Sequence, residues 1–237
     1  MKYSAILFDL DNTLLDFTKS EEESLHELYC HFFDGRLPED VFTTEFLRIN
    51  HKLWKSVELG EMSPVELKIE RFAQFLDEQN LKLNPHLLAE FYERNLGQNI
   101  YWFKGAEKLL QTLREQFLIG IVTNGLTTVQ RRKYQLTGLD QWCPCYVISE
   151  EVGIAKPEKE IFEIALKQLG VTAEETLMVG DSVSSDFRGA VSMEMDFCWV
   201  SPDDHPLPEE LKAPQFRVSE VEMLGGLLLP TSPTSSH

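Results

Sequence analysis

Apolar and polar positions divide the chain into a long helical block and a later stretch in which strands and helices alternate. From residue 17 to about residue 102, apolar side chains recur every three or four positions, the period of an amphipathic helix. The first helix is expected to open at a capping box over residues 20–23, and the third at Ser63-Pro64. The helices predicted in this block span residues 20–32, 41–59, 64–76 and 85–96.

A different pattern begins after Gly105, where short apolar runs alternate with amphipathic segments of about ten residues. Strands are predicted at residues 5–8, 117–122, 145–148, 176–179 and 197–200, with an edge strand at 217–218. Helices are predicted between them at residues 106–115, 128–136, 157–169 and 187–193. Such alternation predicts right-handed βαβ units and a parallel sheet. The expected fold class is therefore α/β, a doubly wound parallel sheet with an all-helical insertion after its first strand.

These patterns also predict the domain boundaries. Residues 1–16 and 104–230 are expected to form the α/β core, and residues 17–103 the helical domain inserted in it. Residues 231–237 are polar and contain proline, so they are expected to be a disordered tail.

Composition narrows the classes of partner. The 237 residues are 43% hydrophobic, and the formal net charge is −17, which argues against nucleic acid and anionic membranes as partners. No apolar run is long enough to span a bilayer, and a strand is expected from residue 4, which leaves no room for a signal peptide. The four cysteines form no Cys-x-x-Cys pair, so we expect reduced thiols and a cytoplasmic location.

Two carboxylates, Asp9 and Asp11, directly follow the first predicted strand. An acidic pair in this position can be a helix cap or a solvated turn. Alternatively, carboxylates this close need a cation between them, which indicates a metal site, a nucleophile, or both. The residues that follow the other strands decide between these interpretations.

The second, third and fourth predicted strands are also followed by polar residues suited to phosphate chemistry. These residues are Thr123, Asn124, Gly125, Lys156, Asp181 and Asp186. Because the carboxyl ends of parallel strands meet at one edge of a sheet, they are expected to gather with Asp9 and Asp11. Carboxylates from two strands suit Mg²⁺, a carboxylate can attack a phosphate ester, and hydroxyl, amide and ammonium groups can bind phosphoryl oxygens.

The order Asp-x-Asp-x-Thr, Thr-Asn-Gly, Lys-Pro and Gly-Asp-x₄-Asp resembles the haloacid dehalogenase superfamily. The resemblance implies a Rossmann-like core with a C1-type helical cap and Mg²⁺, with Mn²⁺ as an alternative. It implies that Asp9 is the nucleophile and a metal ligand. It gives Asp11 the general acid/base role and a metal contact through its backbone carbonyl. Asp181 is implied as a metal ligand, and Asp186 as a further group that supports the metal site.

The same resemblance assigns Thr123 and Lys156 to the phosphoryl group, with Asn124 and Gly125 extending the phosphate cradle. Dehalogenases of the superfamily lack an aspartate at the position of Asp11, because a halide leaving group needs no proton. The presence of Asp11 therefore implies a phosphatase.

A narrower resemblance is to the noncanonical pyrimidine nucleotidases, carried by residues 122–125, Gln130, 136–139 and 147–157. It implies a small phosphorylated substrate, a nucleoside 5′-monophosphate, cleaved through an aspartyl-phosphate by a monomer or dimer. A sugar-phosphate phosphatase or phosphomutase of the same superfamily is the alternative, and a non-catalytic binding protein is a third hypothesis.

Three other features are interpreted as structural. The basic run at residues 131–133 is expected to be a solvated helix face, and the acidic run at residues 21–23 a helix start. Five aromatic residues could stack on a base, but helical spacing is more typical of core positions. They are Phe17, Trp54, Tyr101, Trp102 and Phe103.

Overall fold

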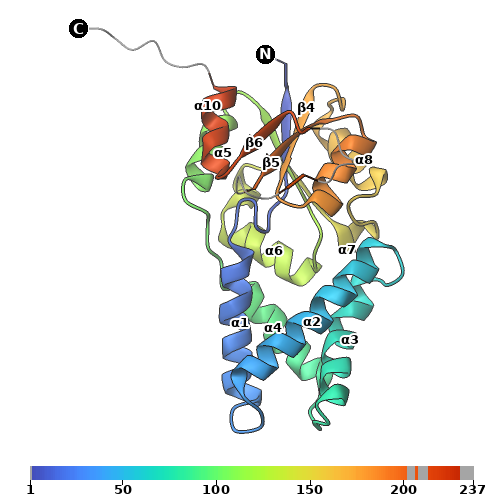
Figure 1. Cartoon of the computed structure of the whole chain (residues 1–237). Helices are drawn as coiled ribbons and strands as arrows, with labels where there is room; N and C mark the ends of the chain where they lie inside the picture. Colours follow the sequence, from blue (N-terminus) through green and yellow to red (C-terminus); the bar gives the residue numbers. More distant parts are fainter. Residues whose placement is uncertain (1, 202–205, 208–212, 230–237) are drawn as a thin grey trace, which may run out of the picture.

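A computed structural model describes residues 2–201, 206–207 and 213–229. The tail predicted at residues 231–237 lies outside the described residues. A sheet with its flanking helices forms one end of the molecule, and four helices form the other (Figure 1). Among the described residues, none of the helices has the length and apolar character needed to cross a membrane.

The sheet has six strands, all parallel, in the order β3-β2-β1-β4-β5-β6. The strands are β1 (Ala5–Phe8), β2 (Leu118–Thr123), β3 (Cys145–Ile148), β4 (Thr176–Gly180), β5 (Asp196–Val200) and β6 (Phe216–Val218). Each lies within one residue of its predicted span, and the last is at the edge of the sheet as expected. The order reverses at β1 and β4, so the doubly wound α/β core is confirmed.

Helices cover both faces of the sheet. They are α5 (Ala106–Leu113), α6 (Thr127–Leu136), α8 (Lys159–Leu169), α9 (Arg188–Ser192) and α10 (Leu224–Leu228), with short turns α7 (Ser149–Val152), η1 (Leu139–Gln141) and η3 (Val221–Met223). Alternate residues of β1 face opposite sides, as a strand requires: Ile6 and Phe8 pack with α5 and α10, and Leu7 packs with α8 and α9. Both faces are therefore buried, which explains why the strands are continuous apolar runs.

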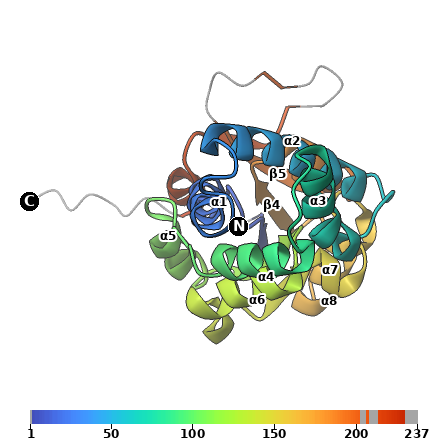
Figure 2. The ribbon, with the colours of Figure 1, turned by 90° about the horizontal axis from the view of Figure 1, so that it is seen from below.

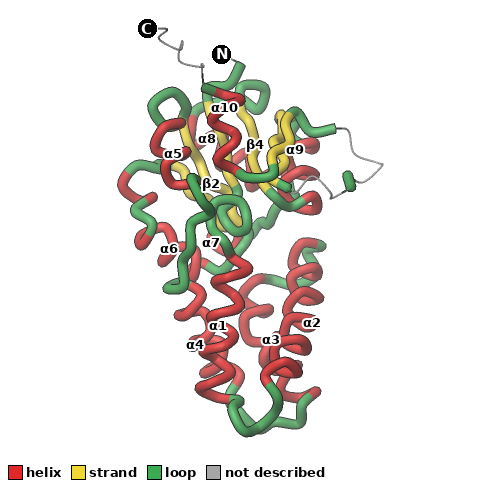
Figure 3. The backbone as a smooth tube through the Cα atoms, turned by 60° about the vertical axis from the view of Figure 1, so that its left-hand side comes forward, coloured by secondary structure: helices red, strands yellow, loops and turns green. Residues whose placement is uncertain are grey.

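The insertion consists of α1 (Phe17–Phe32), α2 (Glu39–Glu58), α3 (Pro64–Glu78) and α4 (Pro85–Leu96). Figure 2 shows these helices in a ring, with α1 between α2 and α4. Their apolar faces meet in a separate core rich in phenylalanine, and this core also includes Leu126 and Val129 at the start of α6. Figure 3 shows the insertion as purely helical and loop structure beyond the sheet. The exact domain boundaries stay a prediction.

Apart from α1, the predicted helices start within two residues of their predicted positions; α2 begins at Glu39 and α8 at Lys159, where residues 41 and 157 were expected. Ser63 and Glu66 form the predicted capping box of α3. Helix α1, however, begins three residues before Ser20, because Asp16 is its cap and accepts a hydrogen bond from the Lys19 amide. The capping box predicted at residues 20–23 is therefore wrong. Ser20 lies inside the helix and is buried there.

Candidate active site

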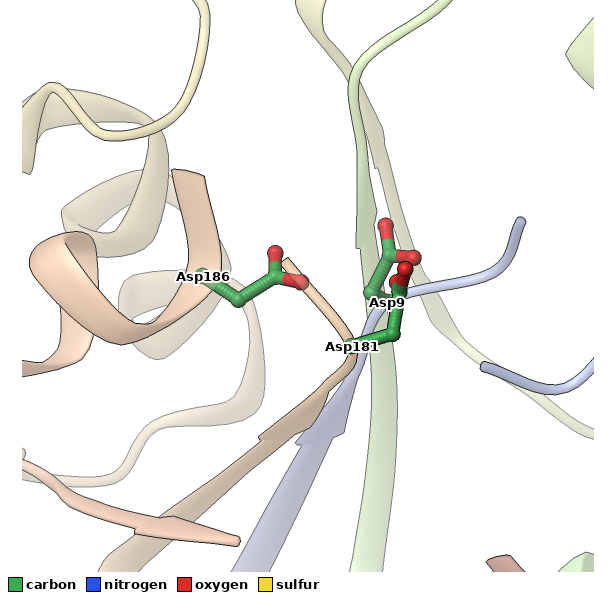
Figure 4. A group of neighbouring side chains, drawn as sticks. All are labelled: Asp9, Asp181 and Asp186. Atoms are coloured by element: carbon green, nitrogen blue, oxygen red, sulfur yellow. The ribbon is translucent and has the colours of Figure 1, made fainter. Parts of the chain in front are cut away.

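Three aspartates from two neighbouring strand ends face one another at the reversal point of the sheet (Figure 4). Asp9 directly follows β1, Asp181 directly follows β4, and Asp186 lies five residues further along the chain. One carboxylate oxygen from each lies within 4.8 Å of the others. Ligands of parallel α/β folds bind at this place in the sheet. The group could hold a metal ion, and its all-oxygen donor set is of the kind that Mg²⁺ prefers.

Close local contacts fix the orientation of the two aspartates in the loop after β4. Asp186 lies on a π-helical turn, η2 (Val183–Phe187), and its Oδ2 accepts a hydrogen bond from the Ser182 amide at 3.1 Å. A Cβ atom on Gly180 would lie 2.3 Å from the same Oδ2, so only glycine fits there. Thr13 Oγ1 donates to Asp181 Oδ1 at 3.2 Å, and the Trp199 indole donates to the carbonyl of Asp181 at 2.9 Å.

Lys156 joins two of these carboxylates. Its buried ammonium group donates to Asp9 Oδ1 at 2.5 Å and to Asp186 Oδ1 at 2.6 Å. The Lys156 backbone is held in turn by the side chain of Asn124, which accepts from its N–H at 2.8 Å and donates to its carbonyl at 3.0 Å. These two hydrogen bonds thereby link the segment after β2 to the segment after β3.

The site carries more negative than positive charge. Three carboxylates face a single ammonium group, which would leave an excess of two negative charges in a buried place if all three were ionised. Burial raises the pKa of Asp9 well above its usual range, against the opposing effect of Lys156. Burial and the charge of Asp186 raise the pKa of Asp181 to about 7. Burial disfavours the charged form of Lys156, but the two carboxylates outweigh it and raise its pKa. A divalent cation would balance the charge.

Asp11 lies apart from the three-carboxylate group. Lys133 Nζ donates to its Oδ1 at 2.6 Å, and Gln130 Nε2 donates to its Oδ2 at 2.8 Å. Both partners come from α6, so Asp11 is oriented by the core helix beneath the insertion. Gln130 Nε2 also donates to Thr123 Oγ1 at 3.0 Å. The hydroxyl of Thr123 thus serves as an acceptor toward Gln130, and its own proton is available to a ligand.

Gly125 is placed differently from the expected cradle. Its N–H donates to Ser149 Oγ at 3.0 Å. In this arrangement the amide of Gly125 is occupied within the protein, and the side chain of Asn124 is occupied by Lys156.

A cavity of about 220 Å³ opens between the core and the insertion. Asp11, Gly125 and Lys133 line it from the core. The insertion contributes Phe17, Glu21, Asn50, Trp54, Glu58, Arg71, Tyr92 and Leu96. The insertion therefore supplies much of the wall that a leaving group would meet.

Sequence reasoning missed Lys133 and Glu21 as site residues. Lys133 was expected on a solvated face, but it is 1% exposed and pairs with Asp11. Its position carried a signal, because it follows the buried Leu126 and Val129 by seven and four residues and so shares their helix face. Glu21 was interpreted as a helix start, but it lines the cavity. Phe17 and Trp54, interpreted mainly as core, also line it.

The sheet is doubly wound, and carboxylates and a lysine converge at the point where its strand order reverses. These features define a class of α/β enzymes whose polar site lies at the strand ends. Comparison with known proteins identifies the family. Residues 3–193 match the haloacid dehalogenase-like hydrolases, and the chain belongs to this family. It is therefore a hydrolase, as the order of its motifs implied.

Two similar proteins match nearly the whole chain. The HAD-hydrolase YfnB of Bacillus subtilis is 32% identical over 96% of both chains. Its magnesium-bound crystal structure superposes with a TM-score of 0.84, covering 97% of this chain and 100% of that one. The pyrimidine 5′-nucleotidase YjjG of Escherichia coli is 33% identical over 96% of this chain and 99% of its own. A glyceraldehyde 3-phosphate phosphatase of Pyrococcus abyssi is 32% identical over 82% and 79%, respectively.

Proposed function

We propose that this hydrolase is a Mg²⁺-dependent phosphatase that cleaves nucleoside 5′-monophosphates with pyrimidine or noncanonical bases. The observation that carries the proposal is the cavity that leads from Asp11 to the aromatic and polar side chains of the insertion. A phosphate bound at Asp9 would direct its ester group into this space. In this proposal, residues 17–103 act as the cap over a core formed by residues 1–16 and 104–230.

The metal proposal rests on donor chemistry and charge. Asp9, Asp181 and Asp186 would hold Mg²⁺, together with the backbone carbonyl of Asp11, and the similar protein YfnB has been crystallised with magnesium. Bound Mg²⁺ supplies positive charge that favours ionised carboxylates and offsets the charge of the phosphoryl group. Mn²⁺, which takes the same oxygen ligands, is expected to substitute.

Asp9 is the proposed nucleophile. One of its carboxylate oxygens attacks phosphorus, the bond from phosphorus to the ester oxygen breaks, and an aspartyl-phosphate forms. Lys156 already contacts Asp9 at 2.5 Å, so its ammonium group can offset charge on both the nucleophile and the phosphoryl oxygens. Asn124 acts indirectly, since it holds the Lys156 backbone.

Asp11 is the proposed general acid and base. It gives a proton to the leaving ester oxygen and then takes one from the water that hydrolyses the aspartyl-phosphate. Gln130 donates a hydrogen bond to the oxygen of the Thr123 hydroxyl. The proton of that hydroxyl therefore remains available to donate to a phosphoryl oxygen.

The proposal of a nucleotide substrate rests on the volume of the cavity and on the residues that line it. A volume of about 220 Å³ corresponds to about seven water molecules. Trp54 and Phe17 offer planar surfaces to a base, and the insertion also contributes hydrogen-bonding side chains. The similar protein YjjG, which matches almost end to end, is named for pyrimidine nucleotides.

The test is a panel of phosphate esters assayed for phosphate release with Mg²⁺. We expect dUMP and UMP to be hydrolysed with a kcat/KM well above that of ribose 5-phosphate and glyceraldehyde 3-phosphate. Asp9→Asn is expected to lower kcat by at least about 10³-fold, as loss of a nucleophile does. The matched control is Asp77→Asn on an exposed turn of α3, which should keep wild-type turnover.

A sugar-phosphate phosphatase is the second candidate, favoured by the similarity to the Pyrococcus abyssi enzyme. Equal or better activity on sugar phosphates would overturn the nucleotide assignment and leave the phosphatase proposal intact. A phosphomutase would give a phosphorylated isomer in place of free phosphate. Retained turnover in Asp9→Asn would remove Asp9 as the nucleophile.

A further inference from the structure

Arg71 on α3 is a buried arginine whose guanidinium group is only partly satisfied. The residue is 2% exposed and lines the cavity beneath the insertion. Its Nη1 donates to Asn50 Oδ1 at 3.3 Å. Among the described residues, Nε and Nη2 have no hydrogen-bond partner. A buried charged donor without partners is costly, so a structural role alone does not account for this arrangement.

The two unpartnered nitrogens lie on the same edge of the guanidinium plane. Nε–H and the outer N–H of Nη2 point in the same direction, which is the edge that arginine uses to bind two acceptors at once. The remaining nitrogen is fixed by Asn50, and the guanidinium carbon lies 4.8 Å from the centre of the Tyr92 ring. Arg71 is thus held in place, and both nitrogens of its bidentate edge are buried without a hydrogen-bond partner among the described residues.

An acceptor is linked to Arg71 through Asn50. Glu21 Oε1 accepts hydrogen bonds from Asn50 Nδ2 at 3.2 Å and from the Tyr92 hydroxyl at 3.0 Å. Asn50 therefore bridges Arg71 and Glu21, and all four side chains line the same cavity. This end of the cavity offers both donors and an acceptor.

Charge favours a neutral ligand over a second anion. Lys133 also lines this cavity, but it is already paired with Asp11. Another phosphate or a carboxylate bound beside Arg71 would therefore still meet Glu21 and Glu58. A neutral heterocycle avoids that repulsion. One of its carbonyl oxygens has two lone pairs and can accept from both N–H groups of the Arg71 edge, and an N–H on the ring or an exocyclic amine matches Glu21.

We infer that Arg71 is the base-recognition residue of this enzyme, binding the carbonyl edge of a pyrimidine ring while Glu21 accepts from a neighbouring N–H. The inference rests on the proposed nucleotidase function and names the group that selects its substrate. It makes Arg71 a specificity residue, distinct from the groups that act on the phosphate.

The test compares two substrates that differ only by the base, dUMP and 2-deoxyribose 5-phosphate. The ratio of their kcat/KM values isolates the contribution of the base. Loss of one bidentate pair changes discrimination by roughly 5- to 150-fold. We therefore expect Arg71→Met to lower this ratio at least 10-fold, mainly by lowering kcat/KM for dUMP. Arg71→Lys should also lower it, because lysine keeps the charge but has no bidentate edge.

The matched control is Arg48→Met, which removes an exposed arginine of the insertion that pairs with Glu45 and Glu78. It should leave the ratio unchanged. Thermal unfolding separates recognition from folding, because replacing an unsatisfied buried charge with a methionine should preserve or raise Tm. A fall in Tm with equal loss on both substrates would assign Arg71 a structural role and overturn the inference.

The nucleotidase proposal and the proposed role of Arg71 would be overturned by different results. A wild-type ratio near one would overturn the nucleotidase proposal and base recognition together. A large wild-type ratio that Arg71→Met and Arg71→Lys leave unchanged would overturn the role of Arg71 alone.

Discussion

Lys133 Nζ donates to Asp11 Oδ1 at 2.6 Å, so the core helix α6 holds the proposed general acid/base. The lysine is 1% exposed, and its ammonium group also lies 4.9 Å from the centre of the Phe17 ring. Phe17 is the first residue of α1, where the chain enters the insertion. Catalysis and the position of the insertion are therefore connected through one ammonium group.

Lys133→Met should impair the proton-transfer step more than it impairs folding. Without the ammonium group, the Asp11 carboxylate keeps Gln130 as its one partner within the described part of the chain, and it is no longer held in one orientation. General acid/base catalysis contributes about 10²- to 10⁴-fold, so we expect kcat to fall by at least about 10-fold. The loss should be smaller for p-nitrophenyl phosphate, whose leaving group needs little protonation, and steady-state kinetics on both esters measure the difference.

The control for this variant is Arg132→Met, the exposed neighbour on the same helix. It should retain wild-type kcat on both esters. If Lys133→Met lowered both activities equally along with Tm, the lysine would serve folding alone.

The sheet and its site could be predicted because their signals are local. Each strand is an apolar run that ends in the polar residue it positions, and strand ends of a parallel sheet necessarily share an edge. Asp9, Lys156, Asp181 and Asp186 therefore meet as the sequence indicated. The predicted start of α1 was wrong because Asp16 and Ser20 are both residue types that cap helices well. Only the burial of Ser20 excludes Ser20 as the cap.

The cavity could not be predicted, because it depends on how the insertion lies on the core. Lys133, Glu21 and Arg71 come from three helices and are ordinary surface residue types. Charged residues are rarely buried, so the sequence favoured a solvated face for Lys133 and a helix start for Glu21, and it did not single out Arg71. Only their position on the wall of one cavity distinguishes them from the exposed charges on the same helices.

Asn124 should matter through the position of Lys156. Asn124→Ala removes two hydrogen bonds to the lysine backbone, each contributing about 0.5–1.5 kcal/mol. We expect stability to fall by about 1–3 kcal/mol and kcat to fall by about 10- to 100-fold, since the ammonium group then loses its fixed place. Denaturant unfolding and steady-state kinetics measure both. Wild-type kcat in a destabilised variant would show that Lys156 is held by its carboxylate partners alone.

Gly180→Ala should weaken metal binding without touching a ligand. The new Cβ would lie 2.3 Å from Asp186 Oδ2 and would force that carboxylate to move. Changes in groups that orient ligands cost about 10- to 100-fold in metal affinity, and we expect a loss in that range in a Mg²⁺ titration of activity. The control is Gly226→Ala, where nothing lies within 4 Å of the added carbon. An unchanged Mg²⁺ requirement in Gly180→Ala would show that Asp186 is not needed at the metal.

Without metal, the protein should lose stability as pH rises toward neutrality. Burial and the charge of Asp186 raise the pKa of Asp181 from 3.8 to about 7, so the folded state holds a proton that the unfolded state has released. That contribution is fully present below about pH 4 and is lost as pH rises to 7, at up to about 1.4 kcal/mol per pH unit. Mg²⁺ competes with the proton, so its stabilisation should grow over the same window.

Thermal unfolding at pH 5 and pH 8, with EDTA and with Mg²⁺, measures both effects. We expect the rise in Tm on adding Mg²⁺ to be larger at pH 8 than at pH 5. Asp181→Asn, which keeps the side chain's shape but removes the titrating group, should show less loss of metal-free Tm between the two pH values. If wild type and Asp181→Asn lost equal stability, Asp181 would not be the group that titrates.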